Sequence, residues 1–294
     1  MATSTRGRTR APAAAKGAGR LGPAYAGLLL ATPVAVGAIY SVMAATGIAG
    51  PAATGPTVRP LLAVVADGQT WRSLTWTLST ALVATALALG AACASALWLR
   101  ARPWWLRFAA LPLAVPHVAA ALAALLVVGQ SGWISRLCVA VGLTAAPADF
   151  PVLVYDRAGV ALILTFAWKE FPYLLLTAVA VLATDTSDLE GVARTLGASP
   201  AQTFRRITWP LLWRGIAPAV LATFAYLIGQ YEVPALLAPG DPLAYPLLSY
   251  ERWVDPTLAR RAEAHVLGLM ALATVAVLVA LHAWWQGRHD GTRA

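Results

Sequence analysis

Long apolar runs alternate with short polar segments along the whole chain. Six of these runs are long enough to cross a bilayer, which takes about 20 apolar residues in a helix. We predict transmembrane helices over residues 25–45, 71–99, 106–128, 158–183, 213–237 and 264–285. Pro112 and Pro116 interrupt the third run, and we expect a kink there because proline lacks the backbone donor that a helix needs. The pattern therefore predicts an all-α membrane protein with six transmembrane helices.

Composition supports a membrane protein and excludes an ordinary water-soluble domain. Of the 294 residues, 59% are hydrophobic and only 12% are charged, whereas soluble domains carry about 25% charged residues. The net charge of +9 could indicate nucleic-acid binding, but in a membrane chain it is more typical of arginine-rich cytoplasmic loops. We therefore expect no nucleic-acid partner. The two cysteines are too few to form a disulfide framework.

The distribution of arginine and lysine predicts the topology. Most of these residues lie in the two tails, after the second helix and between the fourth and fifth helices, so these segments are expected on the cytoplasmic side. We predict a disordered basic cytoplasmic tail over residues 1–22 and a six-helix domain over residues 23–286. A cytoplasmic loop at 184–212 belongs to that domain, and residues 287–294 form a second cytoplasmic tail.

The polar stretch between the fourth and fifth helices, residues 188–210, is unusual in such an apolar chain. Leu189 to Leu196 are suitable helix formers, and Gly197 is a plausible helix end. Pro200 can then occupy the first turn of a second helix that leads into the membrane. From the residues alone, this stretch is either a rigid lever for a cytoplasmic partner or a helical connector with basic residues at the lipid headgroups.

A motif in this stretch resembles the cytoplasmic loop of inner-membrane permease subunits of binding-protein-dependent (type I) ABC importers. That loop reads E-A-A, three residues, G, nine residues, then I-x-L-P. The residues aligned with it are Gly191, Val192, Ala193, Gly197, Ile207 and Pro210. Gly191 takes the place of the motif glutamate, Glu190 stands one position earlier as its candidate replacement, and Trp209 takes the place of the leucine. We expect the difference at Gly191 to affect the strength or geometry of docking.

The resemblance covers about residues 71–285 and implies the ABC importer permease fold. The segments WKEFPYLLL and GQYEVPALL are most similar to the permease branch for polyamines, thiamine and iron. The resemblance implies a protein of the bacterial plasma membrane that works with ABC ATPase subunits, a second permease chain (the same or different) and an extracytoplasmic substrate-binding protein. It also implies that the short loop helix inserts into the ATPase, which binds ATP and Mg²⁺, whereas this chain has no catalytic residue.

Phosphate-binding and metal-binding motifs are missing from the sequence. Lys16 and Lys169 are the two lysines, and neither lies in G-x-x-x-x-G-K-[ST], so this chain has no phosphate-binding loop of that type. The four histidines lie on separate segments without the spacing of metal ligands, and we predict no metal site. His117, after Pro116, is expected to be a hydrogen-bonded core residue.

Charged residues inside the predicted helices are the remaining candidates for function. Lys169 and Glu170 lie near the middle of the fourth helix, where an ionisable group costs about 2.5–3.5 kcal/mol, and Glu232 lies in the fifth. They either face a translocation pathway or hold helices together, and Lys169 could pair with Glu232. An ion-coupled secondary transporter would use these three charges, and a membrane enzyme or assembly factor is a third class. The G-x9-I-x-x-P signature favours the importer permease; the cargo has no signature in the sequence.

Overall fold

The computed structural model describes residues 15–51, 53, 55–100 and 102–290, and these residues contain helices and no strand. The long helices are α1 (Ala15–Ala45), α3 (Gly68–Leu99), α5 (His117–Val128), α7 (Val160–Asp185), α10 (Trp209–Ile228) and α13 (Leu258–Asp290). The short helices are α2 (Arg59–Ala66), α4 (Pro103–Ala109), α6 (Trp133–Ala140), α8 (Ser187–Thr195), α9 (Pro200–Thr203), α11 (Glu232–Leu237) and α12 (Tyr245–Val254). Two 3₁₀ turns, η1 (Leu111–Ala114) and η2 (Pro147–Asp149), and one π-helical turn, η3 (Phe204–Thr208), complete the described elements.

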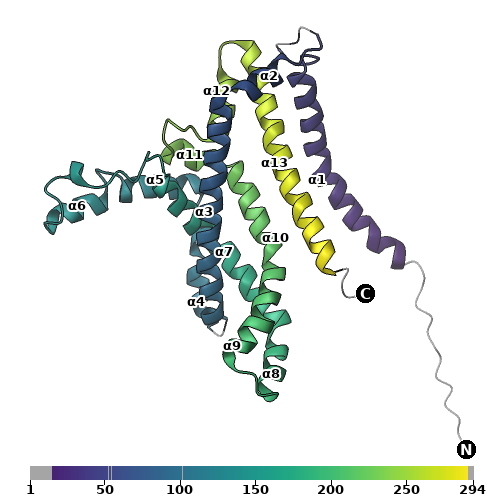
Figure 1. Cartoon of the computed structure of the whole chain (residues 1–294), viewed down its shortest axis with the longest axis vertical. Helices are drawn as coiled ribbons and strands as arrows, with labels where there is room; N and C mark the ends of the chain where they lie inside the picture. Colours follow the sequence, from purple (N-terminus) through teal and green to yellow (C-terminus); the bar gives the residue numbers. More distant parts are fainter. Residues whose placement is uncertain (1–14, 52, 54, 101, 291–294) are drawn as a thin grey trace, which may run out of the picture.

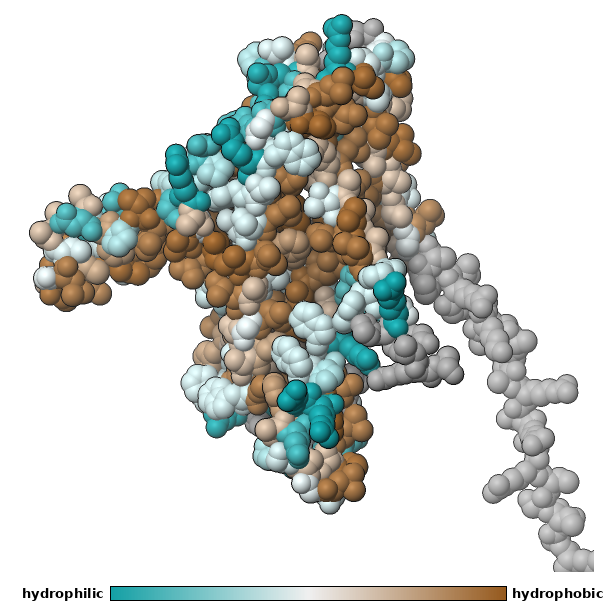
Figure 2. Space-filling model, in the orientation of Figure 1, coloured by the Kyte–Doolittle hydropathy of each residue, from teal (hydrophilic) through white to brown (hydrophobic). Residues whose placement is uncertain are grey.

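Six helical segments of the described chain are long and apolar enough to cross a membrane, which confirms the predicted number. They are Tyr25–Ala45, Gly68–Leu99, His117–Ala140, Val160–Thr184, Pro200–Ile228 and Leu258–Arg288. Apolar side chains cover the middle of the face shown in Figure 2, and hydrophilic side chains gather toward its two ends. The N-terminal end of α1 and the C-terminal end of α13 point toward the end of the molecule that carries α8 (Figure 1).

The two terminal helices are longer than the sequence predicts. Helix α1 begins at Ala15, so residues 15–22, expected as part of a disordered tail, are helical. Helix α13 continues to Asp290, past the expected domain end at residue 286. The rest of the two predicted tails, residues 1–14 and 291–294, lies outside the described residues.

The third apolar run is broken rather than kinked. We predicted one helix over residues 106–128, but the structure divides it into α4, η1 and α5. Pro112 lies in the first turn of η1, and Pro116 is the residue before α5. Two prolines four residues apart remove two backbone donors within one turn, which a continuous helix cannot absorb. As a result α5 turns away from the bundle and carries α6 at its outer end (Figure 1).

The fifth helix also differs from its predicted limits of 213–237. It begins at Pro200, runs through α9, η3 and α10, and ends at Ile228, and the separate helix α11 follows. Pro234 explains the break, because a proline there cannot donate to the carbonyl of Gln230 and is tolerated only in the first turn of a new helix. Glu232 therefore opens α11 instead of lying inside the fifth span.

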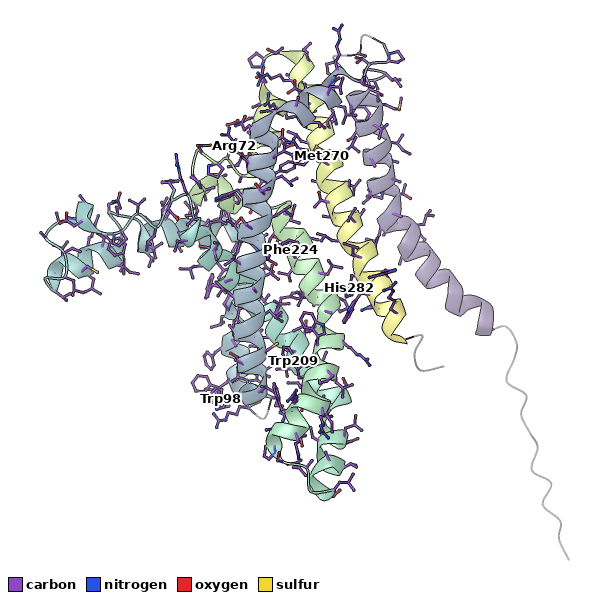
Figure 3. All side chains as sticks on the ribbon, viewed as in Figure 1. Arg72, Trp98, Trp209, Phe224, Met270 and His282 are labelled. Atoms are coloured by element: carbon purple, nitrogen blue, oxygen red, sulfur yellow. The ribbon has the colours of Figure 1, made fainter. Side chains whose placement is uncertain are left out.

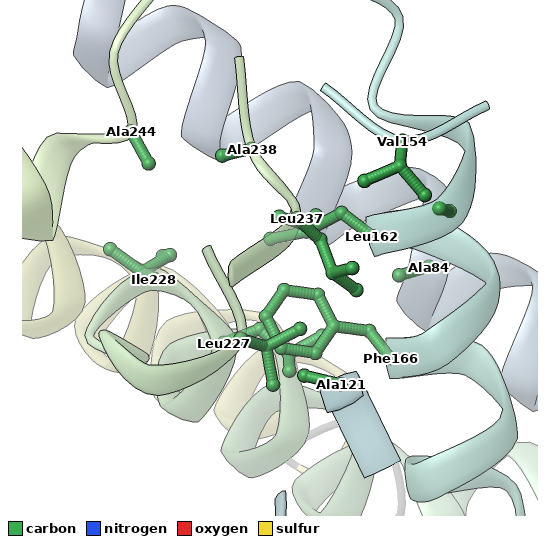
Figure 4. Packing of buried hydrophobic residues seen from close by; sticks show 13 residues of the cluster. Ala84, Ala121, Val154, Leu162, Phe166, Leu227, Ile228, Leu237, Ala238 and Ala244 are labelled. Carbon is green, nitrogen blue, oxygen red and sulfur yellow. The ribbon is translucent and has the colours of Figure 1, made fainter. Parts of the chain in front are cut away.

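Helices α3, α7 and α10 form the packed centre of the bundle. Buried alanines line α3 and let its neighbours approach closely: Ala81, Ala84, Ala88, Ala92 and Ala96. Gly215 of α10 lies so close to α7 that a Cβ atom there would be 2.6 Å from the Val181 side chain. Figure 4 shows larger side chains, among them Phe166 of α7 and Leu237 of α11, filling the space beside α3. This three-helix centre is the body to which α8 is attached.

The end of α3 farthest from α8 is held by a cluster of charged residues. Asp67 caps α3 by accepting a hydrogen bond of 2.9 Å from the backbone of Gln69. Arg252 of α12 donates to the Asp67 carboxylate at 2.6 Å and lies 3.1 Å from the carboxylate of Glu263 on α13. One guanidinium thus joins α3, α12 and α13, and we refer to Asp67, Arg252 and Glu263 as the distal clasp.

Candidate functional site

The corner after α8 has the geometry that the sequence predicts at Gly197. This glycine has φ +81°, in the left-handed region that favours glycine. Its N–H donates to the carbonyl of Arg194 at 3.0 Å, and the N–H of Ala198 donates to the carbonyl of Ala193 at 3.0 Å. These two bonds form a Schellman motif, which satisfies the carbonyls at the end of a helix. The corner is therefore a defined stop between α8 and the next helix.

The helix after this corner is continuous with the fifth membrane span. Ser199 and Gln202 form a reciprocal capping box, and Pro200 occupies the first turn, as predicted. Further along, Pro210 has no N–H for the preceding turn, and the backbone widens into η3, where the N–H of Trp209 bonds to the carbonyl of Phe204. A rigid helical connection therefore runs from the corner into α10.

One face of α8 is apolar and exposed. Leu189, Val192 and Leu196 have 49%, 56% and 82% of their surfaces exposed, and their spacing places them along one side of the helix. Ala193, one turn after Leu189, is buried. Gly191, at the position of the motif glutamate, has open space where a side chain would begin.

The other two motif residues lie farther along, in and after the π turn. Ile207 is half-buried in η3, and Pro210 is exposed in the first turn of α10. Trp209 between them is exposed and lies, like Trp98 of α3, toward the end of the bundle that carries α8 (Figure 3). Tryptophans at this level are typical of a membrane–water interface, which separates the exposed face of α8 from the spans.

Glu190, the candidate replacement for the motif glutamate, faces the body of the protein. Its carboxylate points toward the body: Arg100, just after α3, donates to the two oxygens at 3.2 and 3.0 Å, and the Thr208 hydroxyl donates at 2.6 Å. Burial by itself would raise the pKa of Glu190, but the hydrogen bonds from Arg100 and Thr208 outweigh it and hold the pKa below its ordinary value. The side chain is only 12% exposed, so Glu190 is not part of the exposed apolar face of α8.

Sequence reasoning missed Arg100 and Thr208 as members of this site. Arg100 contributed only to the charge count that predicts topology, and it lies 90 positions from Glu190 in the chain. Its position directly after a long apolar helix is the one local signal, since a cation is favourable at a helix C-terminus. Nothing in the sequence indicates that Thr208 faces a carboxylate.

Lys169 of α7 forms hydrogen bonds with the backbone of the broken third span. Its ammonium group donates to the carbonyls of Pro112 at 2.6 Å and Val115 at 2.5 Å, and the side chain is buried. These carbonyls lie where η1 ends, and that of Pro112 also accepts a hydrogen bond of 3.2 Å from the N–H of Val115. The predicted pairing of Lys169 with Glu232 is wrong, since Glu232 is exposed at the start of α11.

Glu170, next to Lys169, belongs to a second polar group. Its carboxylate lies 3.3 Å from Nε2 of His117, and the Tyr226 hydroxyl lies 3.3 Å from the same nitrogen. Gln230 donates to that hydroxyl. His117 is hydrogen-bonded, as predicted, and the group links α5, α7 and α10. Within the described residues, no three His, Cys, Asp or Glu side chains come together as metal ligands.

Solved structures of ABC importers share this fold. One is a bacterial alginate ABC transporter in complex with an alginate pentasaccharide-bound periplasmic protein, with a TM-score of 0.69, 18% identity and coverage of 89% of this chain and 90% of that one. Another is a bacterial ABC transporter involved in import of the acidic polysaccharide alginate, with a TM-score of 0.68, 18% identity and coverage of 93% and 98%. At this identity the likeness concerns the fold.

Curated relatives are named as permease proteins of transport systems. A probable sulfate transport system permease protein, cysT, from Chlorokybus atmophyticus is 32% identical over 145 residues, 48% of this chain and 47% of the relative. The molybdenum transport system permease protein ModB of Mycobacterium tuberculosis is 33% identical over 175 residues, 58% of this chain and 60% of the relative. The chain thus spans about half to three fifths of the length of these relatives.

A family model covers most of the chain. Residues 86–291 match the model described as "Binding-protein-dependent transport system inner membrane component". The match includes every residue of the motif aligned above, from Gly191 to Pro210. It also includes four of the six candidate spans in full and the end of α3. With its six apolar spans and its importer fold, this chain belongs to the family of binding-protein-dependent transport system inner membrane components.

Proposed function

We propose that this chain is the permease subunit of an ATP-driven importer in a bacterial plasma membrane, supplying half of a translocation pathway. The observation that carries the proposal is the exposed apolar face of α8, at the hydrophilic end of a six-span protein. A separate ATPase chain binds ATP and Mg²⁺ and performs hydrolysis, and α8 receives its movement. Family membership argues against the ion-coupled secondary transporter, and so does the commitment of Lys169 to two backbone carbonyls.

The apolar face of α8 suits a helix-binding groove on the ATPase. Leu189, Val192 and Leu196 follow the i, i+3, i+7 spacing of helices that insert into apolar grooves. Left in water, three large side chains at about half exposure or more would form an apolar patch of the kind that marks an interaction site. Arg205 and Arg206, exposed on η3, can contact the ATPase or lipid headgroups beside it.

The remaining partners follow from the same proposal. A second permease subunit, a copy of this chain or a different one, completes the pathway, and an extracytoplasmic binding protein delivers the cargo. The periplasmic protein in the alginate transporter complex is an example of such a component in a protein of the same fold. The side that carries α8 and the two terminal helix ends is the cytoplasmic side, in keeping with the excess of arginine there.

We propose tetrahedral oxyanions as the first cargo class to test. Two relatives that cover about half of this chain are named for sulfate and molybdenum transport, and molybdenum in aerobic water is the oxyanion molybdate. The branch predicted from the sequence instead transports polyamines, thiamine or iron. Uptake of labelled sulfate and molybdate, compared with spermidine, thiamine and ferric iron, decides between the two classes.

The docking proposal is tested by placing a charge on α8. We expect Leu196→Glu to abolish co-purification of the ATPase with the tagged chain from its native host, because a carboxylate would have to enter an apolar groove. Val58→Glu is the matched control, since Val58 is 60% exposed beside α2, at the other end of the molecule. If both variants retain the ATPase at the wild-type level and insert normally, α8 is not the docking element.

A further inference from the structure

We infer that Glu190 is a positioning residue that fastens α8 to α3 and to the α9–α10 helix, so that a displacement of α8 moves both spans together. The inference rests on the proposed function and deepens it, because it assigns the connection between the docking helix and the membrane. Arg100 and Thr208 are the other two members, and we call the three residues the proximal clasp. Together they join segments that lie 90 and 18 residues away from Glu190 in the chain.

The geometry of the proximal clasp suits a mechanical connection. The two guanidinium nitrogens of Arg100 bind the two carboxylate oxygens in a bidentate pair, which restrains orientation as well as distance. The Thr208 hydroxyl binds one of the same oxygens at 2.6 Å from the last residue of the π turn. A single carboxylate therefore receives three donors from two different membrane spans.

Apolar packing contributes little to the attachment of α8. Ala193 is the one apolar residue of this nine-residue helix that is buried among its described side chains. A cavity of about 250 Å³ lies beside Glu190, lined by Arg194, Thr203 and Phe204 among others. Since this space is open rather than filled by side chains, the connection between α8 and the body depends on the polar contacts of the clasp.

Adjacent residues of α8 then have different roles: one binds the body of the protein and the next faces outward. Successive residues of a helix point about 100° apart. Position 190 faces the body and carries the clasp, whereas Gly191 faces open space, with Val192 on the exposed apolar face. Glu190 is therefore an internal member of the coupling element, and the partner contacts the neighbouring residues.

The fastening can be tested on the full chain in lipid nanodiscs, without a partner or cargo. We expect Glu190→Gln and Arg100→Gln to raise amide hydrogen exchange in α8 about tenfold, because each removes the bidentate ion pair. Arg100→Lys keeps the positive charge but cannot form the bidentate pair, and it should give an intermediate increase in hydrogen exchange. Asp188→Asn is the matched control, since it removes an exposed acid from the same helix. Unchanged exchange in both glutamine variants would overturn the fastening.

Whether a movement of α8 reaches α3 and the α9–α10 helix requires a second measurement, on the complex with the co-purified ATPase. In the wild type, ATP with vanadate should change hydrogen exchange in α8, at the end of α3 and over residues 200–208 together. In Glu190→Gln the change should remain confined to α8, while the ATPase stays bound. A change that reaches α3 and residues 200–208 equally in the variant would show that Glu190 is structural only. Failure of the ATPase to co-purify with the wild-type chain would instead contradict the proposed function and leave the nanodisc result as it stands.

Discussion

The two ends of α3 are held by charged clasps of different composition. In the distal clasp, one guanidinium lies between two carboxylates and joins three long elements of the body, α3, α12 and α13. In the proximal clasp, one carboxylate receives a guanidinium and a hydroxyl, and it joins the body to a short helix with an exposed apolar face. The comparison indicates that the distal clasp maintains the fold, whereas the proximal clasp connects the fold to a partner.

Removal of the distal guanidinium should have the largest effect. We expect Arg252→Leu to lower the free energy of unfolding by about 2–3 kcal/mol, because Asp67 and Glu263 would lose their shared cation. The loss stays below that of a fully buried pair, since the two carboxylate side chains are 30% and 18% exposed. Thermal unfolding in detergent measures it. Arg260→Leu, which removes a longer and more exposed pair with Asp255, should change stability much less; equal effects would contradict the structural role of the distal clasp.

The hydrogen bonds of Lys169 provide a second test of the comparison between the two clasps. We expect Lys169→Met to destabilise the protein by about 1–2 kcal/mol, because the carbonyls of Pro112 and Val115 lose the ammonium donor in an apolar setting. The destabilisation is limited because the variant no longer has to bury the charged ammonium group. Unfolding measurements should show little change for Leu176→Met, an apolar exchange on the same helix. Greater stability in Lys169→Met would mean that these bonds do not compensate for burying the ammonium group.

A substitution at Gly197 tests the α8 end of the molecule without changing any residue of the proximal clasp. Valine at this position has to adopt φ +81°, which costs about 1–2 kcal/mol although no neighbouring atom would clash with its Cβ. We expect Gly197→Val to insert in the membrane at the normal level and to reduce ATP-dependent uptake of the cargo. Ala198→Val, one residue later and outside the left-handed region, is the control. Full uptake by Gly197→Val would exclude a coupling role for the corner.

Acid should loosen the proximal clasp, with the smallest effect of the four. The pKa of Glu190 is lower in the folded chain than in the unfolded chain, so the clasp contributes stability above the ordinary carboxyl pKa of about 4.3. That contribution declines as the pH falls through the lower folded value. Hydrogen exchange in α8, corrected for intrinsic rates, should therefore be constant from pH 7 to pH 5 and rise below pH 4. In Glu190→Gln the rise should be missing; the same rise in that variant would assign it to another group.

Local signals in the sequence were sufficient for the spans and for the corner. A membrane span needs one continuous apolar run, so its presence can be read from neighbouring residues alone. The stop at Gly197 and the start at Pro200 depend equally on local backbone chemistry, and both are found where they were predicted. The limits of the broken spans were harder to predict, because prolines indicate where a helix is weak but not whether its parts continue in one direction.

The contacts between distant residues could not be predicted. Glu190 and Gly191 are adjacent, and only the orientation of α8 against the body decides which of them faces inward. That orientation depends on Arg100, which local spacing cannot relate to Glu190. The same holds for Lys169, whose acceptors are backbone carbonyls made available by a break in another helix. A sequence does not show which carbonyls a helix break leaves accessible, so a carboxylate appeared to be the natural partner.

The burial of Lys169 also has a practical consequence for chemical labelling. The chain contains two lysines; Lys169 is only 4% exposed, and its amine is bonded to two carbonyls. An amine-reactive reagent should therefore leave position 169 unmodified in the folded protein and modify it once the break between η1 and α5 opens. Mass spectrometry of the peptide around Lys169 would then report the opening of this part of the membrane domain in native membranes, without any engineered probe.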